Sequence, residues 1–316
     1  MDKSPVVSII TATYNRSNVL AFTIASVRQS NFTDWELWVI GDSCTDDTEK
    51  VVASFNDPRI HFVNLEQNFG EQSGPNNQGF EYCQGRYIAY LNHDDLWLPN
   101  HLETVVGAIE ETGADLVYTL VSEIQPDGKV TLAGATPSDR YDPHIFVPAS
   151  SWLLRRELIE EIGPWRFYKE CYNIPSQEWI HRASKAGKDL RLVKRMTAIA
   201  IQSGNRDRVY KKREYKENEY YYNRIASEPD ILERELLTVA ACRYASRVID
   251  LPVGALLWQA LGNIFKNIKR FLLLRLGIHP QALKYFSIYR SKCGVIDHLR
   301  EKRGLDKLEI NQEKNS

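Results

Sequence analysis

Cysteine is scarce in this sequence, and no two cysteines have the spacing of a metal-binding pair. The 316 residues contain five, at positions 44, 83, 171, 242 and 293. Because the number is odd and no CxxC occurs, we expect free thiols in a reducing compartment. The sequence therefore favours neither a disulfide framework nor a cysteine-based zinc site.

Charge of one sign is not in excess. The chain has 40 Lys+Arg and 41 Asp+Glu, which gives a net charge of -1. This balance disfavours proteins that coat nucleic acid, so we expect no nucleic-acid partner. With 43% hydrophobic and 26% charged residues, the composition is that of a folded globular protein.

Long hydrophobic runs are absent. No stretch reaches the roughly 18 apolar residues that a membrane-spanning helix needs. The first apolar run, from Val6 to Ile10, is too short for the core of a signal peptide. We therefore expect a cytoplasmic protein that could also touch the inner face of a membrane.

Three glycine motifs are also missing. The first predicted strand is not followed by GxGxxG, and the chain contains neither GxxxxGK[ST] nor GxSxG. The usual dinucleotide-binding fold, the P-loop NTPases and the hydrolases with a nucleophile elbow are therefore disfavoured.

Short apolar runs alternate with helical patterns over the first 125 residues. This alternation over short loops predicts βαβ units and a mainly parallel sheet, with further helices and one or two strands up to position 215. Beyond position 230 almost every segment has a helical pattern. We therefore predict two parts, an α/β domain over 1–215 and a helical C-terminal region over 216–316. The expected strands are 6–12, 36–40, 59–63, 86–91, 115–122 and 190–201, and the expected helices are 17–29, 46–55, 75–83, 99–112, 155–162 and 176–186.

An amphipathic stretch lies at 256–275. Apolar residues repeat there at spacings of four and three, so they share one helix face, and all the charge is positive. Such a helix could pack on the rest of the chain, form a dimer interface, or lie on an anionic membrane surface. The apolar positions are Leu257, Leu261, Ile264, Ile268 and Phe271.

Acids and amides follow the predicted strands. In an open parallel sheet, ligands bind beyond the carboxyl ends of the strands. Asp94 and Asp95 come directly after the strand that ends near Leu91. Adjacent carboxylates repel each other unless a cation lies between them, and Mg²⁺ or Mn²⁺ would suit them together with a substrate phosphate. Alternatively, one of the two caps the helix that follows.

Four motifs in this part of the chain are similar to those of one known family. The sequence resembles the family 2 glycosyltransferases over about residues 5–205. The resemblance implies a GT-A fold, a Rossmann-like domain that binds a nucleotide sugar. The motifs run from Val7 to Arg16, from Trp35 to Thr48, from Asn68 to Gly79 and from Gly85 to Asp95.

The resemblance assigns roles to residues at these strand ends. Asp42 would recognise the nucleobase, although an Asp in such a loop could also simply cap it. Asp95 would bind the divalent cation, and Asp94 would bind the ribose or assist with the metal. The first position of the family's DxD-type motif is Asn92 here. The other residues implied to bind the nucleotide are Thr13, Tyr14, Asn77, Arg206 and Arg208.

An inverting transfer also needs a base that takes the proton of the acceptor hydroxyl. The family provides a carboxylate at the start of a late helix, and the matching stretch here runs from Pro175 to Trp179. Glu178 is the expected base, at a place where members often have Glu-Asp and this chain has Gln177-Glu178. Alternatively, Glu178 stabilises the helix dipole.

Several positions remain open to a simpler interpretation. Arg206 and Arg208 could bind the diphosphate from a loop or belong to a solvated charged segment. His93 could contact phosphate or pack. Trp152 and Trp165 could stack on a sugar or lie in the core.

The resemblance implies a hexosyltransferase-type enzyme with a UDP- or dTDP-sugar donor. Its acceptor would be a glycan or lipid-linked glycan of a bacterial surface polysaccharide, and its cofactor Mn²⁺ or Mg²⁺. A catalytically inactive scaffold or binding module is the first alternative. A sugar nucleotidyltransferase is a second, but it would need a glycine-rich basic loop after the first strand, and the segment from Thr13 to Ser17 has no glycine.

Overall fold

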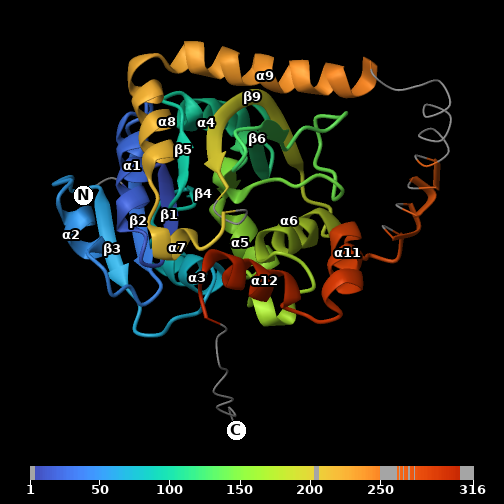
Figure 1. Cartoon of the computed structure of the whole chain (residues 1–316), viewed down its shortest axis with the longest axis horizontal. Helices are drawn as coiled ribbons and strands as arrows, with labels where there is room; N and C mark the ends of the chain where they lie inside the picture. Colours follow the sequence, from blue (N-terminus) through green and yellow to red (C-terminus); the bar gives the residue numbers. More distant parts are fainter. Residues whose placement is uncertain are drawn as a thin grey trace, which may run out of the picture.

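The computed structural model describes residues 4–202, 206–249 and 262–306, apart from 263, 266, 270 and 274. Within this part, nine strands form one sheet (Figure 1). The strands are β1 (Val7–Thr13), β2 (Trp35–Gly41), β3 (Ile60–Asn64), β4 (Tyr87–Tyr90), β5 (Asp95–Trp97), β6 (Leu116–Ile124), β7 (Val130–Ala133), β8 (Trp152–Arg155) and β9 (Leu190–Ile201).

Helices cover the sheet and continue beyond it. Two single turns of 3₁₀ helix, Ala149–Ser151 and Tyr168–Glu170, lie in the connections. The α-helices are α1 (Ser17–Arg28), α2 (Thr48–Ala53), α3 (Ser73–Tyr82), α4 (His101–Thr112), α5 (Arg156–Ile162), α6 (Pro175–Lys185), α7 (Val209–Lys212), α8 (Lys216–Ser227), α9 (Pro229–Ile249), α11 (Pro280–Tyr289) and α12 (Gly294–Arg303).

The sheet is parallel on one side and mixed on the other. Its order is β3-β2-β1-β4-β8-β6-β9-β5, with β7 beside β6. Strands β1 to β4 pair in parallel, as does β6 with β9. The pairs β4–β8, β6–β8, β5–β9 and β6–β7 are antiparallel. The expected mainly parallel pattern therefore holds for the first half of the sheet, and the three short strands β5, β7 and β8 were not expected.

The core lies on both faces of the sheet. On one face, α1 and α4 bury Leu20 and Ile109 against β1, β2 and β6. The other face is covered by α3, α5 and α6, and there the rings of Trp152, Trp165 and Trp179 pack together. Trp152 is 0% and Trp165 2% exposed. These two side chains therefore belong to the core, and the sugar-stacking interpretation was wrong.

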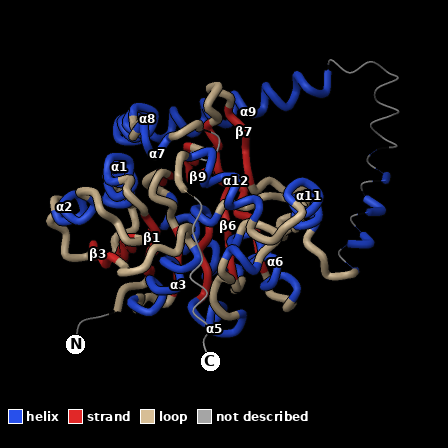
Figure 2. Tube along the Cα trace, turned by 60° about the horizontal axis from the view of Figure 1, so that its bottom comes forward, coloured by secondary structure: helices blue, strands red, loops and turns tan. Residues whose placement is uncertain are grey.

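The C-terminal helices pack on this domain. Helix α8 contacts α1, and α9 runs across β7 and β9 (Figure 1). Helix α12 lies beside α7 (Figures 1 and 2). The boundary predicted between residues 215 and 216 stays a prediction. In the part of the chain that the structure describes, no helix is long and apolar enough to cross a bilayer.

Candidate functional site

The loops after β1 and β2 are tied together at the carboxyl ends of these strands. Asn15 adopts a left-handed backbone (φ 50°), and its Oδ1 accepts hydrogen bonds from the backbone N–H groups of Thr45 (2.8 Å) and Asp46 (3.2 Å). Thr13, the last residue of β1, has a buried hydroxyl without a hydrogen-bond partner among the described residues. An unsatisfied buried hydroxyl at a strand end marks a place where a ligand can supply the missing partner.

Asp42 follows β2 and is 4% exposed. Its carboxylate accepts the backbone N–H groups of Phe69 (2.7 Å) and Gly70 (2.9 Å). Burial raises the pKa of Asp42 to about 6, although these two hydrogen bonds and the charge of Arg300 oppose the shift. A carboxylate has about four lone-pair sites, so Asp42 retains capacity for a further donor such as a nucleobase N–H.

Asp95 begins β5 and is 4% exposed. Its Oδ2 accepts hydrogen bonds from Asn92 Nδ2 (2.8 Å) and from Ser150 Oγ. Burial, followed by the charge of Asp94, raises the pKa of Asp95 well above its ordinary value. Two neighbouring buried carboxyl groups are stable in their ionised form only with a positive charge nearby.

The residues of this motif suit a divalent cation. Asp94 and Asp95 offer carboxylate oxygens, which Mg²⁺ and Mn²⁺ prefer. Among the described residues, no group of three His, Cys, Asp or Glu side chains converges as a complete metal cage. A site with only two carboxylates fits Mg²⁺, which is commonly bound by one or two carboxylates, substrate phosphates and water.

Helix α7 covers this edge of the sheet from outside. The ring of Tyr210 lies 6.5 Å from that of Tyr14, and its hydroxyl is 3.5 Å from His93 Nε2. The other ring nitrogen of His93 lies 3.1 Å from the carbonyl oxygen of Ala12. Burial lowers the pKa of His93. The side chain is therefore packed within the wall of the site, as the simpler interpretation expected.

Arg206 and Arg208 do not converge on Asp94 or Asp95. The guanidinium group of Arg206 binds Glu217 and the carbonyl of Gln202 (2.6 Å). Arg208 has a left-handed backbone (φ 50°), and its N–H donates to the carbonyl of Lys302 (2.8 Å). The contacts of Arg206 are those of a local ion pair. A contact of either residue with a diphosphate stays a prediction.

The side chain of Asn77 is hydrogen-bonded to the backbone of another segment. Its amide donates to the carbonyl of Trp165 (2.8 Å) and accepts the N–H of the same residue (2.9 Å). These two bonds tie α3 to the segment after α5. The amide still has one N–H and one acceptor lone pair beyond these two bonds, so the contact of Asn77 with the nucleotide stays a prediction.

Glu178 lies in the first turn of α6, as predicted. Its carboxylate is held between two guanidinium groups, Arg166 Nη1 at 3.2 Å and Arg182 Nη2 at 3.3 Å. The preceding Gln177 is fully buried and binds both backbone groups of Val147. Gln177 is therefore engaged in structure, and the role of Glu178 as the base stays a prediction.

Several residues of the site carried no recognisable sequence signal. Ser150 holds Asp95 from 55 positions away, and Asn218 of α8 donates to the carbonyl of Asp94 (2.9 Å). Thr23 of α1 donates to the carbonyl groups of His93 (2.8 Å) and Asp95 (2.9 Å). These contacts join segments that are distant in sequence, so no local spacing could have shown them.

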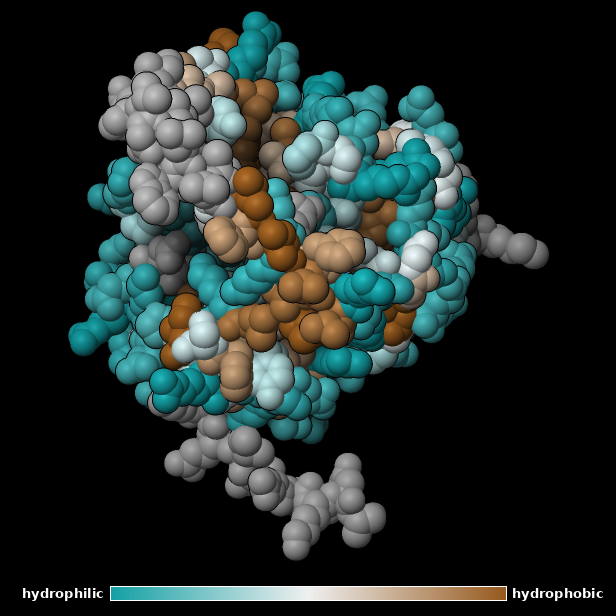
Figure 3. Space-filling view, turned by 90° about the vertical axis from the view of Figure 1, so that its right-hand side faces the viewer, coloured by the Kyte–Doolittle hydropathy of each residue, from teal (hydrophilic) through white to brown (hydrophobic). Residues whose placement is uncertain are grey.

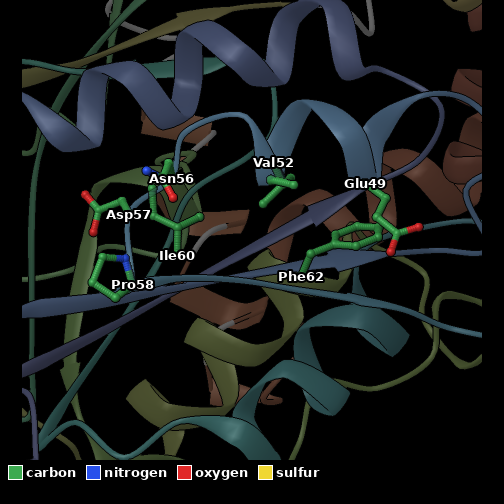
Figure 4. Close-up of a pocket in the computed structure, with 8 residues that line it drawn as sticks. Glu49, Val52, Asn56, Asp57, Pro58, Ile60 and Phe62 are labelled. Atoms are coloured by element: carbon green, nitrogen blue, oxygen red, sulfur yellow. The ribbon is translucent and has the colours of Figure 1, made fainter.

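An open cleft lies elsewhere on the surface. It has a volume of about 410 Å³ and is formed by α2, β3 and the turn between them (Figure 4). Val52, Ile60 and Phe62 line it together with the acids Glu49 and Asp57. Asp57 is already engaged by Arg59 (2.8 Å). No residue of the strand-end site lines this cleft, and we assign no ligand to it.

Three comparisons place the chain among known proteins. The family described as Glycosyl transferase family 2 matches residues 8–163. One relative is the UDP-Glc:alpha-D-GlcNAc-diphosphoundecaprenol beta-1,3-glucosyltransferase WfgD of Escherichia coli, 34% identical over 36% of this chain and 44% of its own. Another is the succinoglycan biosynthesis protein ExoO of Rhizobium meliloti, 30% identical over 50% of this chain and 46% of its own.

The sequence matches thus cover part of this chain, whereas the structural similarity covers most of it. The chain spans about half the length of the curated relatives it matches. The crystal structure of S. aureus TarS 1-349 in complex with UDP-GlcNAc resembles it with a TM-score of 0.54 and 14% identity, over 94% of this chain and 90% of the other. The fold is therefore GT-A-like with a helical C-terminal region, and residues 8–163 match glycosyl transferase family 2, the family that the sequence motifs resemble.

Proposed function

We propose that this protein is an inverting glycosyltransferase that moves a sugar from a UDP- or dTDP-sugar to a hydroxyl group of a glycan or lipid-linked glycan. The observation that carries the proposal is the position of two buried acidic groups at the same edge of the sheet. Asp42 follows the carboxyl end of β2, and Asp94-Asp95 follows that of β4, with both strands parallel to β1 between them. One carboxylate suits a nucleobase N–H, and the other two suit a diphosphate-bound cation. The family and the named relatives support the same class of reaction.

The donor would lie along the strand ends. Asp42 would accept a hydrogen bond from the base, and Tyr14 would line the base pocket. Asp95, assisted by Asp94, would hold Mn²⁺ or Mg²⁺. A cation bound there supplies positive charge that offsets the charge developing on the leaving diphosphate. Asn92 and Ser150 would keep the Asp95 carboxylate in its orientation.

Glu178 would act as the base. Its carboxylate would take the proton of the acceptor hydroxyl as that oxygen attacks the anomeric carbon and the bond to the diphosphate breaks. A single in-line displacement inverts the anomeric centre. Arg166 is 54% exposed at its side chain, whereas Arg182 is anchored to the carbonyl groups of Ile162 and Pro164. Release of Arg166 would therefore free one carboxylate oxygen for the acceptor.

The acceptor would be presented at a membrane surface. Ile264, Phe265 and Phe271 are 55%, 72% and 62% exposed, and Lys269 lies among them. Figure 3 shows hydrophobic side chains gathered on this face of the molecule. Of the predicted amphipathic stretch 256–275, Leu257 and Leu261 lie outside the described residues. An exposed apolar strip with positive charge suits the surface of an anionic bilayer, where a lipid-linked acceptor resides.

Donor turnover tests the transferase. The purified chain would be incubated with Mn²⁺ or Mg²⁺ and with UDP-, dTDP- and GDP-sugars, and the released nucleoside diphosphate would be measured. We expect metal-dependent release from one donor and its loss in Asp95→Ala. Absence of release from all donors, together with absence of nucleotide binding, would leave the scaffold as the better account.

A vesicle assay tests the membrane contact separately. We expect co-sedimentation with vesicles containing anionic lipid, and at least a fivefold weaker binding when Phe265 and Phe271 are both replaced by Ser. The matched control replaces Tyr82 and Tyr220, which are 40% and 52% exposed elsewhere on the surface. Equal binding of both double variants would contradict a membrane role for this strip.

A further inference from the structure

Helix α12 crosses the candidate donor site, although it begins more than 100 residues beyond the segment that matches the family. Three surrounding loops hold it. The N–H of Cys293 donates to the carbonyl of Cys171 (2.9 Å), and the N–H of Arg208 donates to the carbonyl of Lys302 (2.8 Å). Val295 and Ile296 are buried against Tyr168. The helix is therefore docked by apolar contacts at its start and by a backbone bond at its end.

Arg300 of α12 is the third attachment. It is 5% exposed, and its Nη1 donates to the carbonyl of Gly70 in the loop that covers Asp42. Its Nη2 and Nε donate to the carbonyl of Asp306 (2.8 and 3.3 Å). The guanidinium charge faces Asp42 and lowers the pKa of that carboxyl against the larger effect of burial. Arg300 therefore belongs to the base-binding end of the site.

Arg303 lies one helical turn further, on the same side of α12. Its charge reaches the other end of the site, where it acts on His93, Tyr210 and Arg16. The Nε of Arg303 is buried and has no hydrogen-bond partner among the described residues. A buried donor on a charged group is costly to leave unsatisfied, so a site of this kind suits an anion.

Arg16 adds a second guanidinium group at the same place. It is 1% exposed and lies beneath the ring of Tyr210, 5.3 Å from its centroid. Its Nη groups donate to the carbonyl oxygens of Val209 (2.6 Å) and Glu214 (3.5 Å), and its Nε is another buried donor without a partner in the described chain. The charge of Arg16 also acts on the neighbouring Asp94 motif. Two guanidinium groups therefore flank the place where a metal-bound diphosphate would lie.

We propose that α12 is a wall of the nucleotide-sugar site, in which Arg303 together with Arg16 binds the diphosphate of the donor, while Arg300 positions the base-binding loop at Gly70. Arg300 lies at the end of the site where Asp42 would bind the base, and Arg303 lies toward the end where Asp95 would bind the cation. A nucleoside diphosphate bound between these ends would extend in the same direction. This inference rests on the proposed function, because it requires that the strand ends bind such a donor.

The test is binding of UDP and UMP in the presence of Mn²⁺, measured by calorimetry on the full chain. UMP lacks the second phosphate, so the ratio of the two affinities reports contacts to the diphosphate. For Arg303→Ala we expect at least a tenfold loss of UDP affinity and a much smaller loss for UMP. Arg303→Lys keeps the charge without the planar fork and should recover part of the affinity. Arg290→Ala, which removes the same charge from the exposed end of α11, is the matched control.

The outcomes separate the two proposals. If the wild type binds UDP and Arg303→Ala binds it equally well, or loses UDP and UMP affinity to the same extent, α12 has only a structural role and the inference is wrong. If the wild type binds no nucleoside diphosphate, the proposed function itself fails and the inference fails with it. Thermal unfolding of each variant identifies any that does not fold.

Arg300 has its own readout as a positioning residue. Because its charge lowers the pKa of Asp42, Arg300→Gln should move the pH midpoint of UDP binding upward. An unchanged midpoint would show that Arg300 does not act on the base-binding carboxylate.

Discussion

Ser150 Oγ donates a hydrogen bond to Asp95 Oδ2 and at the same time accepts the backbone N–H of Asn92 (3.0 Å). The carbonyl of Ser150 accepts the indole N–H of Trp97 (2.6 Å), so the serine is fixed from two sides. One buried residue thus orients the carboxylate that we assign to the metal. Partners of this kind commonly contribute tenfold to a hundredfold to metal affinity.

Replacement of Ser150 by Ala should therefore weaken the metal site without removing it. We expect the Mn²⁺ concentration for half-maximal activity to rise by about tenfold. The neighbour Ser151 is equally buried, and its hydroxyl donates to the carbonyl of Pro148 (2.7 Å) rather than to a carboxylate, so Ser151→Ala is the control. The same metal dependence in both variants would contradict the role of Ser150.

Because the pKa of Asp42 is raised, we expect nucleotide binding to depend on pH. With burial raising its pKa to about 6, the carboxylate is ionised above this pH and protonated below it. A protonated carboxyl is a poorer acceptor for a base N–H, so UDP affinity should fall as the pH decreases from 7 to 5. The loss should approach about tenfold per pH unit below the pKa.

Asp42→Asn is the reference for this measurement, because the phosphates of UDP titrate equally in both proteins. We expect the ratio of wild-type to variant affinity to be largest at pH 7 or above and to shrink toward pH 5. A ratio that does not change with pH would mean that the charge of Asp42 takes no part in binding.

Glu178→Gln should remove the base and keep its shape. We expect the rate of sugar transfer to fall by about 10²–10⁴, with little change in the KM of the donor. Glu157, in the first turn of α5, is the matched control for an effect on the helix dipole alone. If Glu178→Gln and Glu157→Gln show equal activity, the helix-dipole interpretation of Glu178 is correct.

Because His101 is buried, we expect the stability of the folded protein to depend on pH. It is 1% exposed, stacks on Trp97 with ring centroids 4.2 Å apart, and its Nδ1 lies 2.7 Å from Thr197 Oγ1. Burial lowers its pKa to about 3 in the folded protein. Between this value and about 6.5 the unfolded chain binds a proton that the folded chain does not, so acidification favours unfolding.

Relative to His101→Gln, the wild type should lose about 1.4 kcal/mol of unfolding free energy per pH unit as the pH falls below 6. Denaturant titrations of both proteins at pH 7, 6 and 5 measure this difference. Parallel changes in the two proteins would show that His101 is not neutral in the folded state.

Sequence patterns were sufficient to predict the strands in the first half of the sheet. Strands β1, β2 and β4 are buried on both faces, and such strands appear as nearly continuous apolar runs. Their ends locate Asp42, Asp94 and Asp95 directly. Short strands gave no such signal, because the three residues of β5 and the four of β8 are defined by their antiparallel partners.

The residues that surround the site could not be predicted from sequence patterns, for a related reason. Ser150, Asn218 and Arg300 reach it through tertiary contacts, and Arg300 bonds a residue 230 positions away. Their local sequence is that of ordinary helices or turns. Conversely, Arg206 looked available for phosphate, but a nearby acid, Glu217, engages it.

Calorimetry of UDP binding with and without Mn²⁺, for the wild type, Asp95→Ala and Asp42→Asn, tests the central claim most directly. We expect Mn²⁺ to strengthen binding to the wild type by at least tenfold and this gain to disappear in Asp95→Ala. Asp42→Asn should weaken binding while the gain from Mn²⁺ persists. Binding of UDP that none of these changes affects, or no binding at all, would contradict a nucleotide-sugar site at the ends of β2 and β4.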